Sequence, residues 1–218
     1  TLMVFLTSVI LGLCMGSGAA VSMDYGSGCA DEMRRSIFLS FVLIAAISLL
    51  LNVLVYVSID PILALLRVPT NVIPLMKTYL LIIFAGIAAT FLYNYCASVL
   101  RAIGNAVVPL LFLAVSAVLN VALDLCFVIV LRLGVGGAAF ATVLAQFVSG
   151  IGILLYTLLR FPDLRPKKDD CRCSRKALGR ILNLSLMTCL QQSIMNFGIL
   201  MIQGLVNSFG TVIMAAFA

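Results

Sequence analysis

The sequence is poor in the residues that soluble enzymes use for chemistry. Its 218 residues include no histidine, and only 10% are charged, whereas a soluble domain usually carries about 25% charged residues. The lack of histidine excludes a histidine proton relay, a histidine-ligated metal and a Ser-His-Asp triad. The sequence also has no phosphate-binding loop, which argues against ATP hydrolysis within this chain. The seven cysteines have neither zinc-site nor disulfide-framework spacing.

What the chain has instead is apolar runs long enough to cross a bilayer. Hydrophobic residues make up 63% of the sequence, and a membrane-spanning helix needs about 20 of them in a row. These runs are continuous rather than alternating, which favours helices over barrel strands. The sequence therefore predicts an all-α, polytopic transmembrane helical bundle. Its six spans lie at roughly 2–22, 36–58, 74–98, 107–131, 137–159 and 184–207.

The polar stretch 161–183 divides the chain into two unequal parts. We expect residues 1–160 to hold five spans of one lobe, 161–183 to be a linker, and 184–218 to hold the first span of a second lobe. The chain starts at Thr1 inside an apolar run, and we interpret it as an internal piece of a longer protein. The break at 60–73 predicts a small interfacial helix.

Basic residues gather on one side of the predicted membrane topology. The breaks 24–36, 99–106 and 160–183 would share a side, and short cytoplasmic loops carry most Lys and Arg. We therefore expect a multi-pass protein of a bacterial plasma membrane, with the linker 161–183 in the cytoplasm beside anionic lipid. Nucleic acid is not expected as a partner, because no soluble domain presents the charge. These breaks hold eleven of the 14 Lys and Arg residues: Arg34, Arg35, Arg101, Arg160, Arg165, Lys167, Lys168, Arg172, Arg175, Lys176 and Arg180.

One acidic residue falls inside a predicted span. Asp124 lies within the fourth run, and an acid near the centre of a membrane helix costs about 2.5–3.5 kcal/mol on insertion scales. Such a carboxyl group persists when it is neutral, paired, hydrated or bound to a cation, so Asp124 is the leading functional candidate. The other seven acids are placed in the breaks: Asp24, Asp31, Glu32, Asp60, Asp163, Asp169 and Asp170.

Neutral oxygen-bearing side chains lie at helical spacing around this acid. Asn120 is four residues before Asp124, so both side chains share one helical face. Thr142 and Gln146 have the same spacing on the fifth span, and the glycine-rich segment between the two spans favours close packing. Asn120, Asp124 and Thr142 together would suit Na⁺ or a shared proton. Taken singly, Asn120 can instead be an interhelical hydrogen bond, and Thr142 can bond its own backbone.

Several motifs resemble the multidrug and toxic compound extrusion (MATE) family. The most specific are LRAIGNAVVP at 100–109, LNVALD at 119–124 and GVGGAAFAT at 134–142. The later LQQS at 190–193 and QGLVNSFG at 203–210 resemble the bacterial, DinF-like branch. The resemblance implies twelve spans in two six-helix lobes, of which this chain would hold the second to the seventh; the remainder of the same chain would then be its partner.

The resemblance also implies a function. Members of the family export organic cations and other amphipathic small molecules by alternating access, driven by inward Na⁺ or H⁺, without a cofactor. The family's first-lobe cation site falls on Asn120, Asp124 and Thr142. Gln146, Gln191, Gln192 and Asn196 are candidates for lining the substrate cavity. A lipid-linked oligosaccharide flippase of the same superfamily is the alternative, although no Arg or Lys lies near the middle of a span to bind a pyrophosphate. A membrane-embedded enzyme and a scaffold that does not transport fit less well.

Overall fold

A computed structural model describes residues 2–65, 73–165 and 175–208 of the chain, and these residues form a bundle of antiparallel helices. The helix content is all α, apart from one π-helical segment and one short 3-10 turn, and no strand occurs within these ranges. The predicted all-α bundle is therefore confirmed. The elements are α1 (Leu2–Gly26), α2 (Ala30–Leu65), α3 (Ile73–Ala85), α4 (Ile87–Ala102), α5 (Val107–Asp124), η1 (Leu125–Val130), α6 (Gly134–Arg160), η2 (Pro162–Leu164) and α7 (Arg175–Ser208).

Five stretches of the described chain are long and apolar enough to cross a membrane. They are Thr7–Gly26, Ala30–Ile59, Lys77–Ala102, Val107–Val130 and Gly134–Arg160. They correspond to the first five predicted spans. The sixth prediction, 184–207, lies within α7, a helix of 34 residues that is not among the five by this measure.

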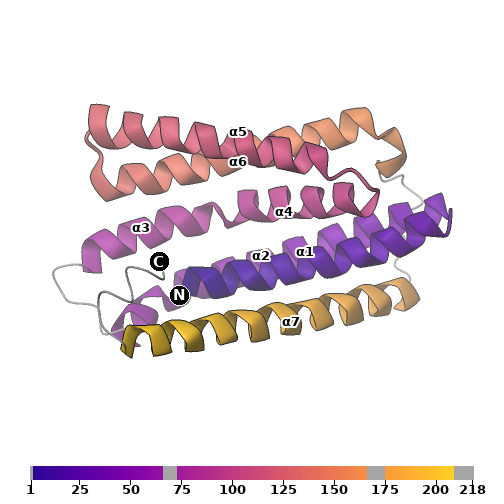
Figure 1. Cartoon of the computed structure of the whole chain (residues 1–218), viewed down its shortest axis with the longest axis horizontal. Coiled ribbons are helices and arrows are strands. Elements are labelled where there is room, and N and C mark those ends of the chain that lie inside the picture. Colours follow the sequence, from indigo (N-terminus) through magenta and orange to yellow (C-terminus); the bar gives the residue numbers. More distant parts are fainter. Residues whose placement is uncertain (1, 66–72, 166–174, 209–218) are drawn as a thin grey trace.

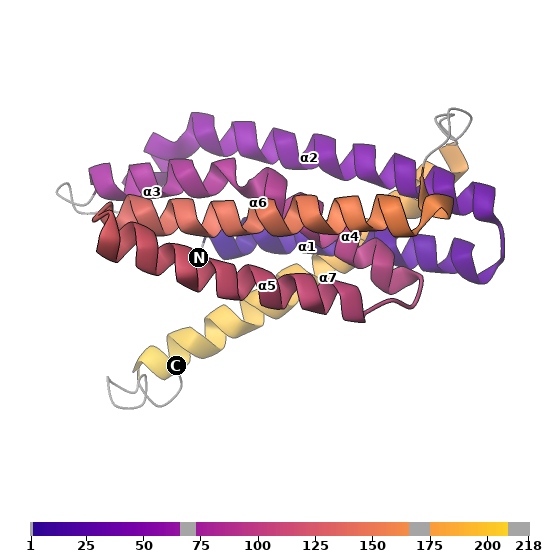
Figure 2. The ribbon, with the colours of Figure 1, turned by 90° about the horizontal axis from the view of Figure 1, so that it is seen from above.

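The helices lie side by side in rows (Figure 1). The α5–α6 pair lies along one edge of the bundle, α3 and α4 run through the middle, and α1, α2 and α7 lie along the other edge. Seen from above, α7 crosses the bundle obliquely and diverges from it toward its C-terminal end (Figure 2). The connection from α1 to α2, that from α4 to α5 and the start of α7 meet at one end, at the right in Figure 1. This arrangement agrees with the predicted grouping of the basic breaks.

Three element boundaries differ from the sequence-based expectation. The predicted third span, 74–98, is broken at Gly86 into α3 and α4. Side chains of α2 bond backbone carbonyls just before this break: Asn52 Nδ2 donates to Phe84 O at 2.6 Å, and the Tyr56 hydroxyl donates to Leu81 O at 2.8 Å. A small interfacial helix is expected at 60–73, but residues 60–65 belong to α2, which continues to Leu65, and residues 66–72 lie outside the described residues. Finally, α7 begins at Arg175, inside the predicted linker.

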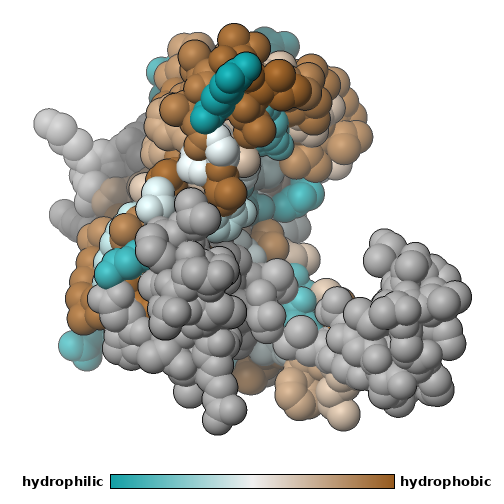
Figure 3. Space-filling model, turned by 90° about the vertical axis from the view of Figure 1, so that its left-hand side faces the viewer, coloured by the Kyte–Doolittle hydropathy of each residue, from teal (hydrophilic) through white to brown (hydrophobic). Residues whose placement is uncertain are grey.

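The best-buried helix is α1, which packs against α2, α4 and α7. Its side chains at Ile10, Cys14 and Val21 are at most 1% exposed. In contrast, α5 and η1 bury almost nothing except Pro109, and they expose large apolar side chains along most of their length. A view of one end of the molecule shows this apolar surface over its upper part (Figure 3). Such a surface is expected where lipid or further protein replaces water.

Candidate cation and substrate sites

The α5–α6 pair positions the predicted cation-site residues. The π-helix η1 follows α5 directly, and a tight turn then leads into α6, with Arg132 at φ 53° and Gly134 at φ 59°. Glycine adopts this left-handed conformation without the steric cost that other residues pay. A Cβ atom at Gly137 would lie 2.9 Å from Leu133 Cβ and 3.2 Å from Phe127 O, so the absent side chain permits the close approach of α6 to η1. The glycine-rich segment thus brings the two helices together as the sequence predicts.

Asn120 and Thr142 meet across this pair of helices. Asn120 Nδ2 donates to Thr142 Oγ1 at 3.3 Å, and Thr142 Oγ1 donates to Ala138 O at 3.0 Å. Thr142 therefore bonds the backbone of its own helix and also contacts Asn120 of the neighbouring helix. Because the amide nitrogen of Asn120 faces the threonine, its amide oxygen is left to accept from, or coordinate, another group.

Asp124 is the last residue of α5, one turn beyond Asn120 and immediately before the π-helix. Its Oδ1 atom is buried and has no hydrogen-bond partner among the described residues. Neither Asn120 nor Thr142 bonds to it. A buried carboxylate oxygen without a partner is costly, and π-helical segments are frequent at functional sites. The structure thus places the third predicted residue near the other two with an unused oxygen.

A polar cavity of about 240 Å³ lies between α4, α5 and α6. Gln146, the one predicted lining residue that falls here, accepts a 2.6 Å hydrogen bond from Thr90 Oγ1 through its Oε1 atom. Asn94 Nδ2 in turn donates to Thr90 O at 2.7 Å. All the lining residues are neutral: Thr90, Tyr93, Asn94, Leu113, Ser116, Gln146 and Ser149. The sequence analysis missed Thr90 and Asn94, although their spacing of four residues is the signal it used for Asn120 and Asp124.

The other predicted lining residues are on α7 and lie apart from this cavity. Gln191 is exposed. Gln192 Nε2 approaches Met15 Sδ at 4.0 Å, and Asn196 Nδ2 donates to Ser8 Oγ at 2.6 Å, so both contact α1. In the described part of the chain, the structure brings Gln146 toward the Asn120–Thr142 pair but leaves these three residues at or near the α1–α7 contact.

A second buried carboxylate corrects the sequence analysis. Asp24 was placed in a polar break, but it lies in α1 and is 1% exposed. The reason is that α7 covers it: Arg180 Nη2 donates to both carboxylate oxygens, at 2.5 and 2.6 Å, and Ser36 Oγ of α2 donates to Oδ2 at 2.5 Å. Arg180 also lies in α7 rather than in the predicted linker. This charge-assisted cluster joins α1, α2 and α7.

The α1–α7 contact continues from this cluster along both helices. A Cβ atom at Gly12 would lie 2.7 Å from Cys189 Cα, and one at Gly16 would overlap the Ser185 backbone, so only glycine permits this approach. Three hydrogen bonds from α7 side chains reach α1 acceptors: Ser185 Oγ to Leu13 O (3.3 Å), Cys189 Sγ to Val9 O (3.3 Å) and Asn196 Nδ2 to Ser8 Oγ (2.6 Å). We call this contact the α1–α7 seam.

Comparison with solved structures places this helical arrangement among known transporters. The chain superimposes on a Vibrio cholerae MATE transporter, VcmN in the bent form, with a TM-score of 0.85 and 26% identity, covering 99% of this chain and 49% of that one. It also superimposes on an outward-facing MATE family transporter of the MOP superfamily, with a TM-score of 0.86 and 23% identity, over 96% of this chain and 47% of that one.

Sequence comparison agrees with the structural one. The chain is 32% identical over its whole length to the Bacillus subtilis protein described as probable multidrug resistance protein YpnP, of which it covers 48%. The chain spans about half the length of the curated relatives it matches. The sequence profile of the MatE family matches residues 1–126, which is more than half of the chain. The chain therefore belongs to the MATE family of multidrug efflux transporters.

Proposed function

We propose that this chain forms part of a secondary active transporter that exchanges organic cations or other amphipathic small molecules for H⁺ or Na⁺, with Asp124 as the coupling carboxylate. The observation that carries the proposal is the buried, unpartnered Oδ1 atom of Asp124, one helical turn from the Asn120–Thr142 hydrogen bond. A carboxylate in an apolar interior needs a compensating positive charge. A proton or a small hard cation supplies it.

The neighbouring side chains fit a cation that prefers oxygen. Hard cations bind carboxylate, amide, hydroxyl and backbone oxygens. Asn120 and Thr142 offer an amide and a hydroxyl oxygen on two side chains that are hydrogen-bonded through Asn120 Nδ2. Among the described residues, no group of three or more His, Cys, Asp or Glu side chains is placed to hold a metal ion. This donor set suits transient binding of Na⁺ or a proton rather than a resident transition metal.

Occupancy of Asp124 changes the packing of the helices around it in the proposed mechanism. The π-helix begins at the next residue, and its last turn bonds Leu131 N to Cys126 O at 3.0 Å. The hydrogen bonds of a π-helix join residues five apart, and a shift by one residue converts them to α-helical bonds. Neutralising Asp124 can therefore shift η1 against α6. Because the polar cavity around Gln146 is built on the same α5–α6 pair, a shift there alters the substrate's surroundings.

Antiport then follows because binding of the coupling ion and binding of the substrate oppose each other. Each ligand weakens the binding of the other when the two favour different helix packings, and the coupling is reciprocal. The neutral lining of the polar cavity suits amphipathic substrates. It offers no Arg or Lys for a lipid pyrophosphate, which is why the flippase alternative ranks below efflux.

The test uses purified full-length protein in vesicles, with ethidium as the transported cation and an imposed H⁺ or Na⁺ gradient. We expect Asp124→Asn to reduce gradient-driven transport at least tenfold, because the side chain no longer changes charge. Asp163→Asn is the matched control, since Asp163 is an exposed acid of η2. Transport by Asp124→Asn at the control rate refutes the assignment of the coupling carboxylate.

A further inference from the structure

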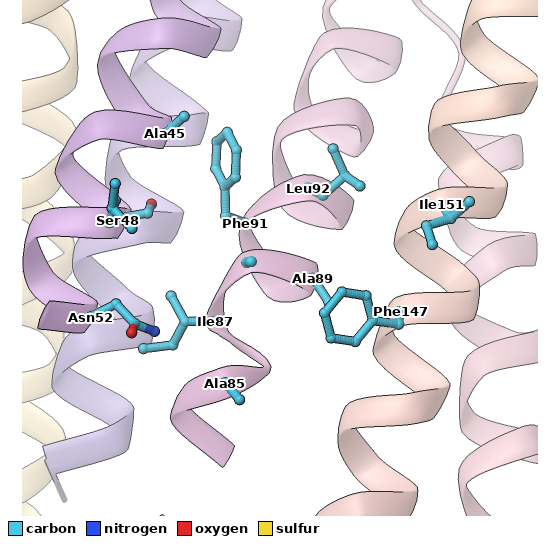
Figure 4. A pocket seen from close by; sticks show the side chains of 12 residues that line it. Ala45, Ser48, Asn52, Ala85, Ile87, Ala89, Phe91, Leu92, Phe147 and Ile151 are labelled. Carbon is cyan, nitrogen blue, oxygen red and sulfur yellow. The ribbon is translucent and has the colours of Figure 1, made fainter. Parts of the chain in front are cut away.

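A separate cavity of about 510 Å³ lies between α2, α4 and α6 (Figure 4). Its wall is almost entirely apolar: Leu92 of α4 lies toward Ile151 of α6, and Phe91 of α4 lies toward α2. None of its lining residues is among those of the polar cavity around Gln146. A volume in the range of 300–1,000 Å³ with few polar groups is typical of a site for a small apolar ligand.

Two polar side chains of α2 interrupt this apolar wall. Ser48 is 4% exposed, and its Oγ atom has no hydrogen-bond partner within the part of the chain that the structure describes. Some other buried hydroxyl groups of the bundle bond the carbonyl four residues earlier, as Ser40 does with Ser36 O at 2.6 Å and Thr157 with Ile153 O at 2.7 Å. Ser48 lacks this bond, so its hydroxyl group is free for a partner that enters the cavity.

Asn52 lies one helical turn beyond Ser48 on the same wall (Figure 4). Its Nδ2 atom donates to Phe84 O at 2.6 Å. The amide nitrogen is therefore held at the α3–α4 break, and the amide oxygen is the atom that remains to accept a hydrogen bond. Ser48 and Asn52 together present one donor and one acceptor, which match a single hydroxyl group.

The surroundings of the cavity identify where its occupant comes from. All the lining residues lie within three of the candidate membrane spans. At the rim, Leu49 is 67% exposed and Ile151 48% exposed, which marks a surface for hydrocarbon rather than water. No charged side chain lines the cavity, so an ionised group would enter without compensation. The occupant must be neutral and must arrive from the bilayer.

We propose that this cavity is a bilayer-facing binding site for a neutral membrane lipid that carries a free hydroxyl group. The hydroxyl accepts a hydrogen bond from Ser48 Oγ and donates one to Asn52 Oδ1, while the aliphatic body of the lipid packs against Phe91, Leu92 and Phe147. The site is distinct from the Asp124 region, so the proposal stands independently of the coupling mechanism.

The experiment uses purified protein in phosphatidylcholine nanodiscs and a photoactivatable hexadecanol with a diazirine in its chain. We expect light-induced adducts on the α2, α4 and α6 segments that line the cavity, and we expect excess unlabelled hexadecanol to suppress them. Ser48→Ala should raise the half-saturating probe concentration about two- to tenfold, the effect of one hydrogen bond. Ala45→Phe, which fills the cavity, should remove the adducts at these positions.

Two controls separate a hydroxyl-specific site from ordinary lipid contact. Ser58→Ala alters a serine of the same helix that is not among the lining residues, and it should leave the titration unchanged. The matching diazirine hexadecane, which has no hydroxyl, should label the cavity weakly and without saturation. Equal labelling by hexadecane, adducts that map elsewhere, absence of adducts, or a titration unchanged by Ser48→Ala would each overturn the proposal.

Discussion

Asp24 is buried and Asp124 is half-buried, and the surroundings of the two acids are opposite. Asp24 receives hydrogen bonds from Arg180 and Ser36 on both of its oxygens, and it lies at one end of the tightly packed α1–α7 seam. Asp124 has a buried oxygen with no partner among the described residues, and it lies at the end of α5, a helix that buries little of its surface.

The difference separates a structural role from a coupling role. A carboxylate whose charge is already compensated gains little from binding a further cation, whereas an uncompensated one gains a great deal. The helices follow the same division. Glycine permits backbone contact along the α1–α7 seam, which has Asp24 at one end, whereas a π-helical turn follows Asp124. We therefore expect changes near Asp24 to alter stability and changes near Asp124 to alter ion coupling.

The largest expected effect comes from removing the partner of Asp24. Arg180→Met leaves a carboxylate of 2% side-chain exposure with only Ser36 as a donor. Loss of one partner from a buried ion pair costs about 3–5 kcal/mol, and the partial exposure of Arg180 reduces this to about 2–4 kcal/mol. Denaturant titration of the purified protein in detergent measures the loss. The double variant Asp24→Asn with Arg180→Met should lose less, and an equal or larger loss would contradict the ion-pair account.

Glycine-to-alanine changes compare the packing of the two regions. Gly16→Ala places a methyl group into the Ser185 backbone and should lower the free energy of unfolding by about 1–3 kcal/mol. The matched change near Asp124 is Gly136→Ala, where a Cβ atom would meet only Ile82 Cδ1 at 3.9 Å. That variant should be neutral or more stable by up to about 1 kcal/mol. Similar losses for both variants would show that the α1–α7 seam is not the tighter contact.

A smaller effect is expected from the hydroxyl group beside Asp124. Thr142→Val keeps the volume of the side chain but removes the acceptor for Asn120 Nδ2. We expect the concentration of H⁺ or Na⁺ that half-activates transport to rise about three- to tenfold, with little change in maximal rate. Thr142→Ser retains the hydroxyl and should restore most of the affinity. An unchanged activation curve for Thr142→Val would remove the threonine from the cation site.

The smallest expected effect is on the stability of the Asp124→Asn variant. Because the Oδ1 atom of Asp124 has no partner to lose within the described residues, its neutralisation should lower the free energy of unfolding by no more than about 0.5 kcal/mol, and relief of the uncompensated charge acts in the opposite direction. Asp24→Asn, measured in parallel, weakens the pair with Arg180 and should lose about 1–3 kcal/mol. Equal losses for the two variants would contradict a structural role for Asp24 and a coupling role for Asp124.

Local spacing made much of the α5–α6 region predictable from the sequence. Residues four apart share a helical face, and the short glycine-rich segment limits how far apart the two helices can lie, so the contact of Asn120 with Thr142 follows from nearby residues. The five spans with the highest hydropathy are predictable for the same reason, because each depends only on its own composition.

Contacts between distant segments were not predictable in this way. Asp24 and Arg180 are 156 residues apart, and each looks like a loop residue until α7 is placed against α1. The break at Gly86 is similar, because the bonds that Asn52 and Tyr56 make to the α3 carbonyls come from another helix. Neither feature has a period or motif that marks it in a single sequence.

The most direct test of the central claim is the release of a coupling ion when substrate binds. Ethidium is added to purified protein in weakly buffered detergent solution, and released H⁺ is followed with an indicator dye, or released Na⁺ by sodium NMR. With Asp124 as the coupling carboxylate, the unaltered protein should release about one cation per ethidium bound. The Asp124→Asn variant should bind ethidium and release none, and an undiminished release from that variant would contradict the account.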